Sequence, residues 1–198
     1  MRQLRRTAAG VAAAVVALIA AATASAQILP EQGTWLVGVY GGVYQPEYSF
    51  LDDGGTGGVR LGYAAAEKVL VTMAIAGTNL DSDDSTLSGD VDIAMFDVNT
   101  SYIFGSGAFG LELTVGGGYA WIDDSVKSIV APGLEACATQ ECDFDNTWTL
   151  NAGLGPTMKL GRVIVNAQYR WRYFVDRNDD EVDGEFAVAL LIPLGGRR

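Results

Sequence analysis

The sequence predicts an all-β protein, an eight-stranded antiparallel up-and-down transmembrane β-barrel. Three observations predict it: eight segments alternate apolar and polar residues, their connections alternate between long and short, and the acidic residues gather in the long connections. The clearest alternation spans 163–174, where odd positions are apolar or aromatic and even positions include Asn166, Gln168, Arg170 and Arg172. Successive side chains of a strand point to opposite faces, so this segment is a strand with one apolar and one charged face.

The first 26 residues have the pattern of a secretory signal peptide. Three arginines precede an apolar run over 8–22, and Ala24-Ser25-Ala26 supplies a small-residue cleavage site ahead of Gln27. The run is alanine-rich and short for a transmembrane anchor. We therefore expect a signal peptide at 1–26 and one barrel domain at 27–198, without a linker or second domain.

The charge balance excludes one class of partner. The whole chain carries −11, and removal of Arg2, Arg5 and Arg6 leaves 10 of 13 basic residues against all 24 acidic residues, or −14. A chain with this charge is not expected to bind nucleic acid or an anionic membrane surface. The 25 glycines and 5 prolines suit twisted strands joined by tight turns.

The first three strands alternate without interruption. The first, 34–44, has four apolar residues at odd positions from 35 to 43. The second, 57–63, has apolar residues at odd positions and Arg60 on the opposite face. The third, 69–78, has apolar residues at odd positions from 69 to 75, and each pattern has the period of two that a strand requires.

The fourth strand, 91–104, alternates from 96 onward, but Asp92 breaks the pattern, so we expect a bulge or a later start there. The fifth, 108–122, sets apolar residues against Glu112 and three glycines, and the sixth, 147–160, has apolar residues at even positions. Gly161-Arg162 forms a two-residue turn into the seventh strand, 163–174. The eighth, 184–194, has apolar residues at even positions from 186 to 194.

The connections distinguish the two ends of this meander. By count, 19 of the 24 acidic residues fall in four segments that are long connections or border them, at 47–53, 81–92, 123–145 and 176–183. The short turns contain only Glu67 among the acidic residues. One end of the barrel is therefore expected to carry long acidic loops and the other end short turns.

Aromatic residues of the apolar face sort to both ends of the strands. Near the short turns lie Trp35, Tyr63, Phe104 and Phe109; near the long loops lie Tyr119, Trp121, Trp148, Trp171, Tyr173 and Phe186. The residues between them are mostly aliphatic. Two aromatic belts around an aliphatic band are typical of a barrel in a membrane with two interfaces, so the apolar face is expected to contact lipid.

The opposite face carries charges of both signs: Arg60, Asp97, Glu112, Lys159, Arg170, Arg172 and Glu185. These charges would fill a narrow interior as an ion-pair network, because a buried charge must be paired or hydrated. Glu185 begins the eighth strand at the depth and on the face of Arg170 and Arg172, which predicts an ion pair with one of them. The alternative is that these charges are the solvated outer positions of a soluble, lipocalin-like barrel.

The sequence resembles the small eight-stranded outer-membrane barrels of the OmpA type. The resemblance rests on the signal peptide, the turn rhythm and glycine-rich amphipathic strands such as Trp35-Leu36-Val37-Gly38-Val39-Tyr40-Gly41-Gly42, and it covers nearly all of the mature chain. It implies location in the outer membrane of a Gram-negative bacterium, with contacts to membrane lipid and lipopolysaccharide. Two features depart from that pattern: the chain ends in Gly195-Gly196-Arg197-Arg198 rather than an aromatic residue, and no periplasmic domain follows.

Enzymatic function is not expected. The barrel enzymes that resemble this architecture, lipid A deacylases, the palmitoyl-transferring barrel and omptin proteases, use a histidine, and this chain has none. Asp97 with Glu112 could form an acid–base pair, but a structural role is favoured. No cofactor is expected. Cys137 and Cys142 lie five residues apart in the longest loop of an exported chain, which favours a local disulfide.

One acidic loop is a candidate for weak divalent-cation binding. Asp176, Asn178 and Asp180 supply oxygen ligands at the first, third and fifth positions of an EF-hand-like loop. Glu181 replaces the turn glycine and Ala187 replaces the bidentate glutamate, so a true EF-hand is excluded.

Three functions remain open from the sequence. Eight strands leave an interior that side chains fill, which favours a structural or surface-interaction role through the acidic loops. The first alternative is a narrow channel for small solutes or ions, gated by rearrangement of the interior ion pairs. The second is a soluble calycin-like periplasmic binding barrel.

Overall fold

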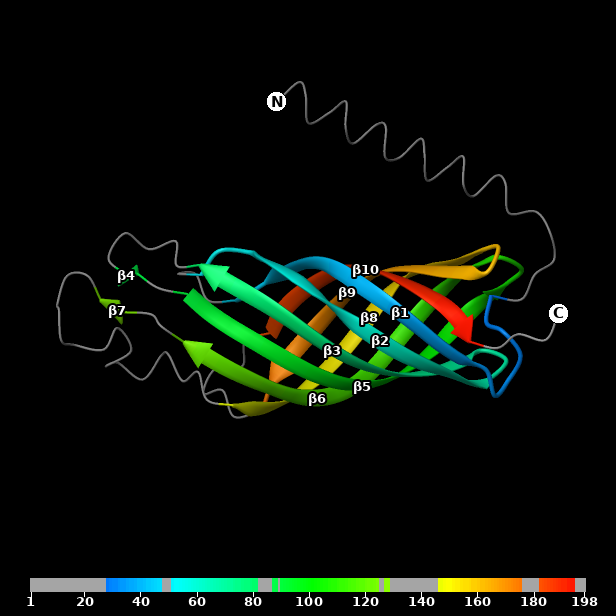
Figure 1. Cartoon of the computed structure of the whole chain (residues 1–198), viewed down its shortest axis with the longest axis horizontal. Helices are drawn as coiled ribbons and strands as arrows, with labels where there is room; N and C mark the ends of the chain where they lie inside the picture. The colour runs from blue at the N-terminus through cyan, green and yellow to red at the C-terminus, as the bar shows by residue number, and fades with distance from the viewer. Residues whose placement is uncertain are drawn as a thin grey trace, which may run out of the picture.

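The computed structural model describes residues 28–47, 51–81, 87–88, 90–124, 127–128, 146–175 and 182–194. Eight strands form a closed barrel in the order β1-β10-β9-β8-β6-β5-β3-β2, with every neighbouring pair antiparallel (Figure 1). The predicted fold class is confirmed. The strands are β1 (Trp35–Gln45), β2 (Gly54–Ala66), β3 (Val69–Asp81), β5 (Asp90–Ser106), β6 (Phe109–Asp124), β8 (Thr147–Leu160), β9 (Val163–Phe174) and β10 (Val182–Leu194).

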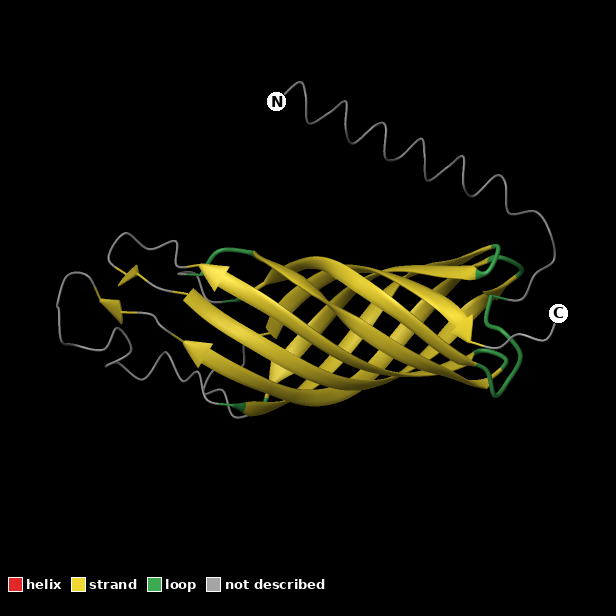
Figure 2. Cartoon of the chain, viewed as in Figure 1, coloured by secondary structure: helices red, strands yellow, loops and turns green. Residues whose placement is uncertain are grey.

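Two further strands lie beyond one end of the barrel. β4 (Leu87–Ser88) and β7 (Lys127–Ser128) pair antiparallel and belong to two of the connections that the sequence predicts to be long (Figure 2). We call this end of the barrel the outer end and the opposite end, with the short turns, the inner end. Within the described ranges, no helix is long and apolar enough to cross a membrane.

The register of the strands fixes the tilt of the barrel. A line of paired residues that leaves Trp35 on β1 passes around all eight strands and returns to Gln45, ten residues further along β1. A stagger of ten over eight strands corresponds to a tilt of about 43°. Ten residues of such a strand span about 24 Å along the barrel axis, close to the ~25 Å apolar band of outer-membrane barrels.

Inward-facing glycines permit the strong curvature of this small barrel. A Cβ atom on Gly38 would collide with the carbonyl oxygen of Leu190 on β10. A Cβ atom on Gly118 would collide with the carbonyl oxygen of Phe96 on β5. Only glycine fits where neighbouring backbones approach this closely, which explains why glycine interrupts the polar face of several strands.

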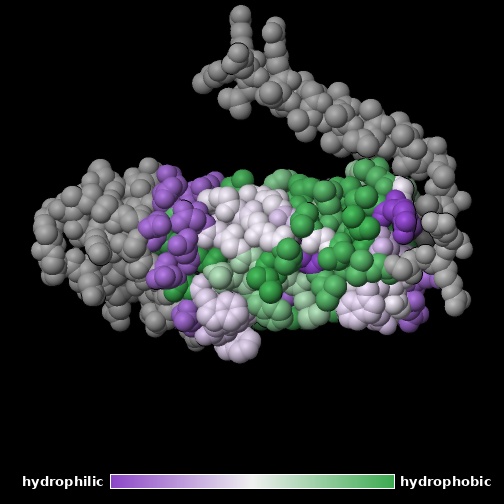
Figure 3. All heavy atoms as spheres, viewed as in Figure 1, coloured by the Kyte–Doolittle hydropathy of each residue, from purple (hydrophilic) through white to green (hydrophobic). Residues whose placement is uncertain are grey.

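The apolar face of the strands points outward. Figure 3 shows an apolar band on the barrel wall, bounded toward the outer end by a hydrophilic collar. The exposed side chains include Val39, Val59, Ile75 and Leu113, with exposed fractions of 56%, 56%, 59% and 42%. The ten belt residues also face outward: Trp35, Phe104, Phe109, Trp121, Trp148, Trp171 and Phe186 are exposed, and Tyr63, Tyr119 and Tyr173 are half-buried.

The expectation of a bulge or a later strand start at Asp92 is wrong. β5 pairs with β3 from Asp90 to Tyr102 and with β6 from Val91 to Ser106 without a change of register. Asp92 keeps its outward direction and is exposed, while Val91 and Ile93 point inward and are buried. The alternation of side chains therefore continues, and what changes near Asp92 is which face of the strand is apolar.

Candidate functional site

The barrel interior is the candidate site, and it has three layers along the barrel axis. The layer at the inner end is apolar and contains Ile28, Leu29, Leu36, Ala64, Leu70, Ile103, Ile164 and Leu191, each at most 4% exposed. We call these eight residues the inner plug. Six of them come from six different strands of the barrel, so their side chains converge across the lumen.

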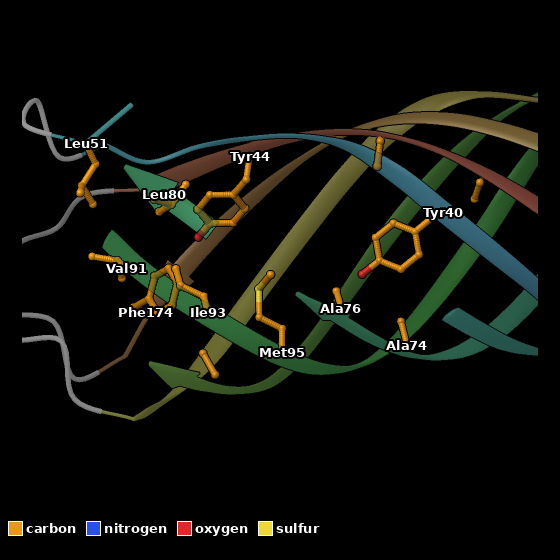
Figure 4. Close-up of a cluster of buried hydrophobic side chains, with 13 residues drawn as sticks. Tyr40, Tyr44, Leu51, Ala74, Ala76, Leu80, Val91, Ile93, Met95 and Phe174 are labelled. Carbon is orange, nitrogen blue, oxygen red and sulfur yellow. The ribbon is translucent and has the colours of Figure 1, made fainter. Parts of the chain in front are cut away.

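The layer at the outer end is also apolar, and we call it the outer plug. Its members are Tyr40, Tyr44, Leu51, Ala74, Ala76, Leu80, Val91, Ile93, Met95, Ala120, Phe174, Ala187 and Ala189. Figure 4 shows Leu80, Ile93 and Phe174 converging from β3, β5 and β9, with Leu51 nearest the outer end. Tyr40, Ala74 and Ala76 lie farther from the outer end than the other labelled residues (Figure 4).

The middle layer is polar and charged. Its centre is Asp97 on β5, which accepts two hydrogen bonds from Arg172 on β9, at 2.8 Å from Nη1 to Oδ1 and 2.7 Å from Nη2 to Oδ2. Both side chains are 1% exposed, so this two-pronged ion pair is shielded from water. Such a geometry is the strongest form of arginine–carboxylate contact.

Arg170 and Glu185 complete a cluster of four charges. Arg170 Nη1 lies 3.4 Å from Asp97 Oδ2 and 3.2 Å from Glu185 Oε2, and Arg172 Nη2 lies 3.7 Å from Glu185 Oε2. Glu185 and Arg170 are direct cross-strand partners on β10 and β9. Two arginines thus share two carboxylates, so the cluster is neutral overall, as a buried charge cluster must be.

The other three residues of the predicted network lie outside this cluster. Glu112 accepts hydrogen bonds from Asn166 Nδ2 at 3.0 Å and Thr114 Oγ1 at 3.4 Å. Arg60 packs its guanidinium over the ring of Tyr40, 4.9 Å from the centroid, and its Nε has no hydrogen-bond partner among the described residues. Lys159 is half-buried near the inner end of β8.

Neutral side chains connect the charged residues. Thr114 accepts a hydrogen bond from Gln168 Nε2 at 2.6 Å and lies 2.8 Å from Ser101 Oγ. Asn151 Nδ2 donates to Asp97 Oδ1 at 3.3 Å, and Thr149 Oγ1 accepts from Arg172 Nη1 at 3.1 Å. The network therefore draws on strands β5, β6, β8, β9 and β10.

Sequence reasoning missed one polar contact at the outer plug. Tyr44 Oη donates to Asp183 Oδ2 at 2.6 Å, and the backbone N–H of Glu47 donates to Asp183 Oδ1 at 3.1 Å. The two side chains are 0% and 3% exposed. Asp183 thereby ties the start of the β1–β2 connection to β10. Tyr44 lies on the inward face of the first predicted strand, but Asp183 lies in a predicted connection, and β10 begins one residue before it. The pairing of the first strand with the last then brings the two residues together.

Two predicted sites lie outside the described residues. These are the disulfide between Cys137 and Cys142 and the weak cation loop at Asp176, Asn178 and Asp180. Among the residues that are described, no group of three or more His, Cys, Asp or Glu side chains could hold a metal ion.

Comparison with known proteins gives similarity at the level of structure only. No protein-family model matches the chain, and no curated protein matches it. The outer-membrane protein OprG of Pseudomonas aeruginosa superimposes with a TM-score of 0.59 at 13% identity, covering 84% of this chain and 98% of OprG. Neisserial surface protein A superimposes with a TM-score of 0.53 at 14% identity, covering 83% and 99%.

A third solved structure is the Ail protein of Yersinia pestis in complex with the heparin analogue sucrose octasulfate. It gives a TM-score of 0.50 at 16% identity, covering 82% of this chain and 99% of Ail. At these identities the likeness shows the fold alone. The chain has the fold of the small eight-stranded outer-membrane barrels, as the resemblance to the OmpA type implied.

Proposed function

We propose that the chain is an outer-membrane barrel of a Gram-negative bacterium with a structural or surface-interaction role through its long acidic external loops. We further propose export by a signal peptide at 1–26 and contact of the barrel wall with lipid and lipopolysaccharide. The fold and the exposed apolar wall support this placement. The soluble calycin-like alternative requires the reverse arrangement, with the apolar face inside and the charges in solvent.

The observation that carries the proposal is an interior filled by side chains. Through the described part of the barrel, the polar middle layer lies between two apolar layers, the inner plug and the outer plug. Ions do not cross apolar layers of packed side chains, because an unpaired charge there is costly. A barrel closed in this way is a rigid anchor for whatever its loops bind.

The outer end carries exposed carboxylates on the described strands as well. Asp81 pairs with Asp90 across β3 and β5, and Asp92 pairs with Asp123 across β5 and β6. Like charges directly opposite each other destabilise a sheet. Asn79 Nδ2 relieves part of this repulsion by donating to Asp90 at 3.2 Å and Asp92 at 2.8 Å.

This charge guides the choice of partner. Carboxylates at the outer end repel a polyanion such as the sucrose octasulfate in the Ail complex. We therefore propose cationic surface partners, or lipopolysaccharide phosphates bridged to the loops by divalent cations. The loop at Asp176, Asn178 and Asp180 is the proposed weak cation site, and no cofactor or nucleic acid is part of the proposal.

No catalytic step is proposed. The chain holds no histidine, and the carboxylates Asp97 and Glu112 both have structural partners in the interior. A buried carboxylate held by two arginines is a poor general base, because its charge is already stabilised. We propose that these carboxylates stabilise the fold.

The surface role is tested by binding of whole cells to a cationic probe such as polylysine-coated beads. Cells that display the chain should bind more beads than cells that lack it. The variant Asp81→Asn/Asp92→Asn/Asp123→Asn should lower binding, whereas Glu31→Gln/Glu67→Gln at the inner end should not. Equal binding by all strains contradicts a role for the acidic outer end.

A gated narrow channel is the second candidate, and one observation favours it. Several buried polar atoms of the middle layer have no hydrogen-bond partner among the described residues, including both polar atoms of Asn99, Arg170 Nε and Glu185 Oε1. These atoms could form new hydrogen bonds if the ion pairs rearranged. Single-channel recordings separate the two functions: a steady current that changes in Glu185→Gln supports the channel, and no current supports the sealed anchor.

A further inference from the structure

We infer that the segment before β1 is a hinged plug that controls access to the polar interior from the inner end. The plug consists of Ile28 and Leu29, which are two of the eight residues of the inner plug. We call these two residues the N-terminal plug, and in this subsection "the plug" means these two residues. This inference goes beyond the surface role proposed above and does not depend on it.

The N-terminal plug lies inside the barrel mouth. Ile28 is 4% exposed and Leu29 is 1% exposed, although neither belongs to a strand. Both belong to the inner plug, whose other members include Leu70 and Ile103 from the strand walls. A Cβ atom on Gly110 would lie 2.7 Å from Ile28 Cδ1, so the absence of a side chain on β6 leaves room for Ile28.

A hinge follows the plug in the sequence. Gly33 has a φ of 89°, a left-handed conformation that glycine adopts at little cost. The Gly33 N–H donates to the Ala64 carbonyl at 2.8 Å, and the Ala64 N–H donates to the Thr34 carbonyl at 2.9 Å. Within the described residues, Gly33 makes the first backbone hydrogen bond of this segment to the barrel. Ahead of that point, burial of the two side chains holds the plug.

A cavity beside the plug gives it room to move. The cavity has a volume of about 500 Å³ and is lined by Ile28, Leu29 and Ile103, together with Glu67, Lys68 and the turn at 105–107. Empty space therefore borders both plug residues. Cleavage before Gln27, as the sequence predicts, leaves one residue ahead of Ile28, so the plug would be the free end of the mature chain.

The two ends of the interior differ in this respect. Twelve of the thirteen outer-plug residues belong to strands, and Leu51 is the exception, so most of the outer plug moves only if the barrel wall deforms. At the inner end, two of the eight residues of the inner plug belong to a segment that is tethered to the barrel at Gly33. The geometry therefore points to the inner end as the route by which water and small solutes reach the middle layer.

A buried cysteine reporter tests this inference. Ser101→Cys places a thiol in the middle layer, two residues from Ile103 on the same inward face, in a chain that also carries Cys137→Ser and Cys142→Ser. The folded protein in lipid vesicles is treated with a small charged methanethiosulfonate reagent. Ile28→Ser/Leu29→Ser should speed labelling at least ten-fold, and the milder Ile28→Ala should give an intermediate rate.

Three controls keep the result interpretable. Glu31→Ser/Gln32→Ser changes two exposed residues of the same segment and should leave the rate unchanged. Heat-modifiable gel migration verifies that each variant is folded. Leu80→Ser weakens the outer plug and should label more slowly than the double plug variant. Parent-like rates in both folded plug variants overturn the inference, as does equal acceleration by the exposed pair or by Leu80→Ser.

Discussion

The middle of the barrel and its outer end use the same strands with opposite polarity. On β5, the middle of the barrel turns Val98 outward and Asp97 inward. A few residues closer to the outer end, the same strand turns Asp92 outward and Ile93 inward. The backbone register is continuous between them. The change of polarity agrees with the proposed placement, because lipid requires an apolar wall, whereas water allows an apolar core inside a polar wall.

This comparison teaches that one barrel contains two kinds of interior. In the middle of the barrel the interior is held by ion pairs and hydrogen bonds, and the outer surface is apolar. At the outer end the interior is held by packing, as in a soluble barrel. Substitutions of equal chemistry should therefore have different effects at the two levels, and the predictions below follow from the largest expected effect to the smallest.

The largest effect is expected for Asp97→Ala. Removal of this carboxylate leaves Arg172 and Arg170 with one remaining carboxylate between them, in an interior shielded from water. The free energy of unfolding should fall by about 3–5 kcal/mol, measured by urea titration in lipid vesicles. Asp92→Ala, on the same strand but exposed at the outer end, is the control and should change stability by less than about 0.5 kcal/mol. Similar losses at both sites would contradict the division into two interiors.

Leu113→Arg should have the next largest effect. Leu113 is 42% exposed on the apolar outer wall of β6, which we propose contacts lipid. An arginine there should cost about 2–4 kcal/mol in the same titration. Asp123→Arg lies on the same face of the same strand, ten residues nearer the outer end, and should cost close to nothing. Thr114 points inward, so a polar exchange such as Thr114→Ser should be tolerated better than Leu113→Arg. Equal tolerance of arginine at 113 and 123 would place the whole strand in water.

Tyr44→Phe tests the polar contact within the outer plug. The substitution removes the hydroxyl that donates to Asp183 at 2.6 Å and leaves the aromatic ring in place. Loss of a buried hydrogen bond to a carboxylate should cost about 1.5–3 kcal/mol. Tyr102→Phe, on the exposed wall of β5, removes a hydroxyl without a buried partner and is the matched control. A smaller loss for Tyr44→Phe than for Tyr102→Phe would show that the contact adds no stability.

The smallest effect is expected from the cysteines of the longest loop. We propose that Cys137 and Cys142 form a disulfide in the exported protein. The ring they close is short, so Cys137→Ser/Cys142→Ser should change global stability by no more than about 1–2 kcal/mol. Mass spectrometry without reductant measures the bond directly, and two free thiols would exclude it.

The sequence was sufficient where alternation and a tight turn coincide. β8 and β9 have the predicted bounds, because each alternates throughout and Gly161, with a φ of 63°, forms the turn between them. The close approach of Arg170 and Glu185 follows from the same reasoning, because two strands joined by one loop pair with each other. The ion pair between them is therefore a local consequence of parity and topology.

The sequence was insufficient where the answer depends on the whole barrel. Asp97 meets Arg172 across the lumen because the stagger of ten sets which levels face each other, and no short segment encodes that number. The expectation of a bulge at Asp92 rests on the assumption that the outward face is apolar along the whole strand, and this face becomes polar near the outer end. Ile28 and Leu29 lie before the first alternating segment, so no periodicity marks them as interior residues.

The pairing of β1 with β10 has a consequence for how the barrel assembles. These strands join residues 35–45 to residues 184–194, so the last hydrogen bonds of the wall connect opposite ends of the chain. Closing so long a loop is slow, and until it closes, both edge strands expose unpaired backbone groups that lipid cannot satisfy. Assembly should therefore be strongly cooperative, with no stable membrane-embedded intermediate that lacks β10. The inner plug includes Leu36 of β1 and Leu191 of β10, so the complete cluster forms only when this final step has taken place.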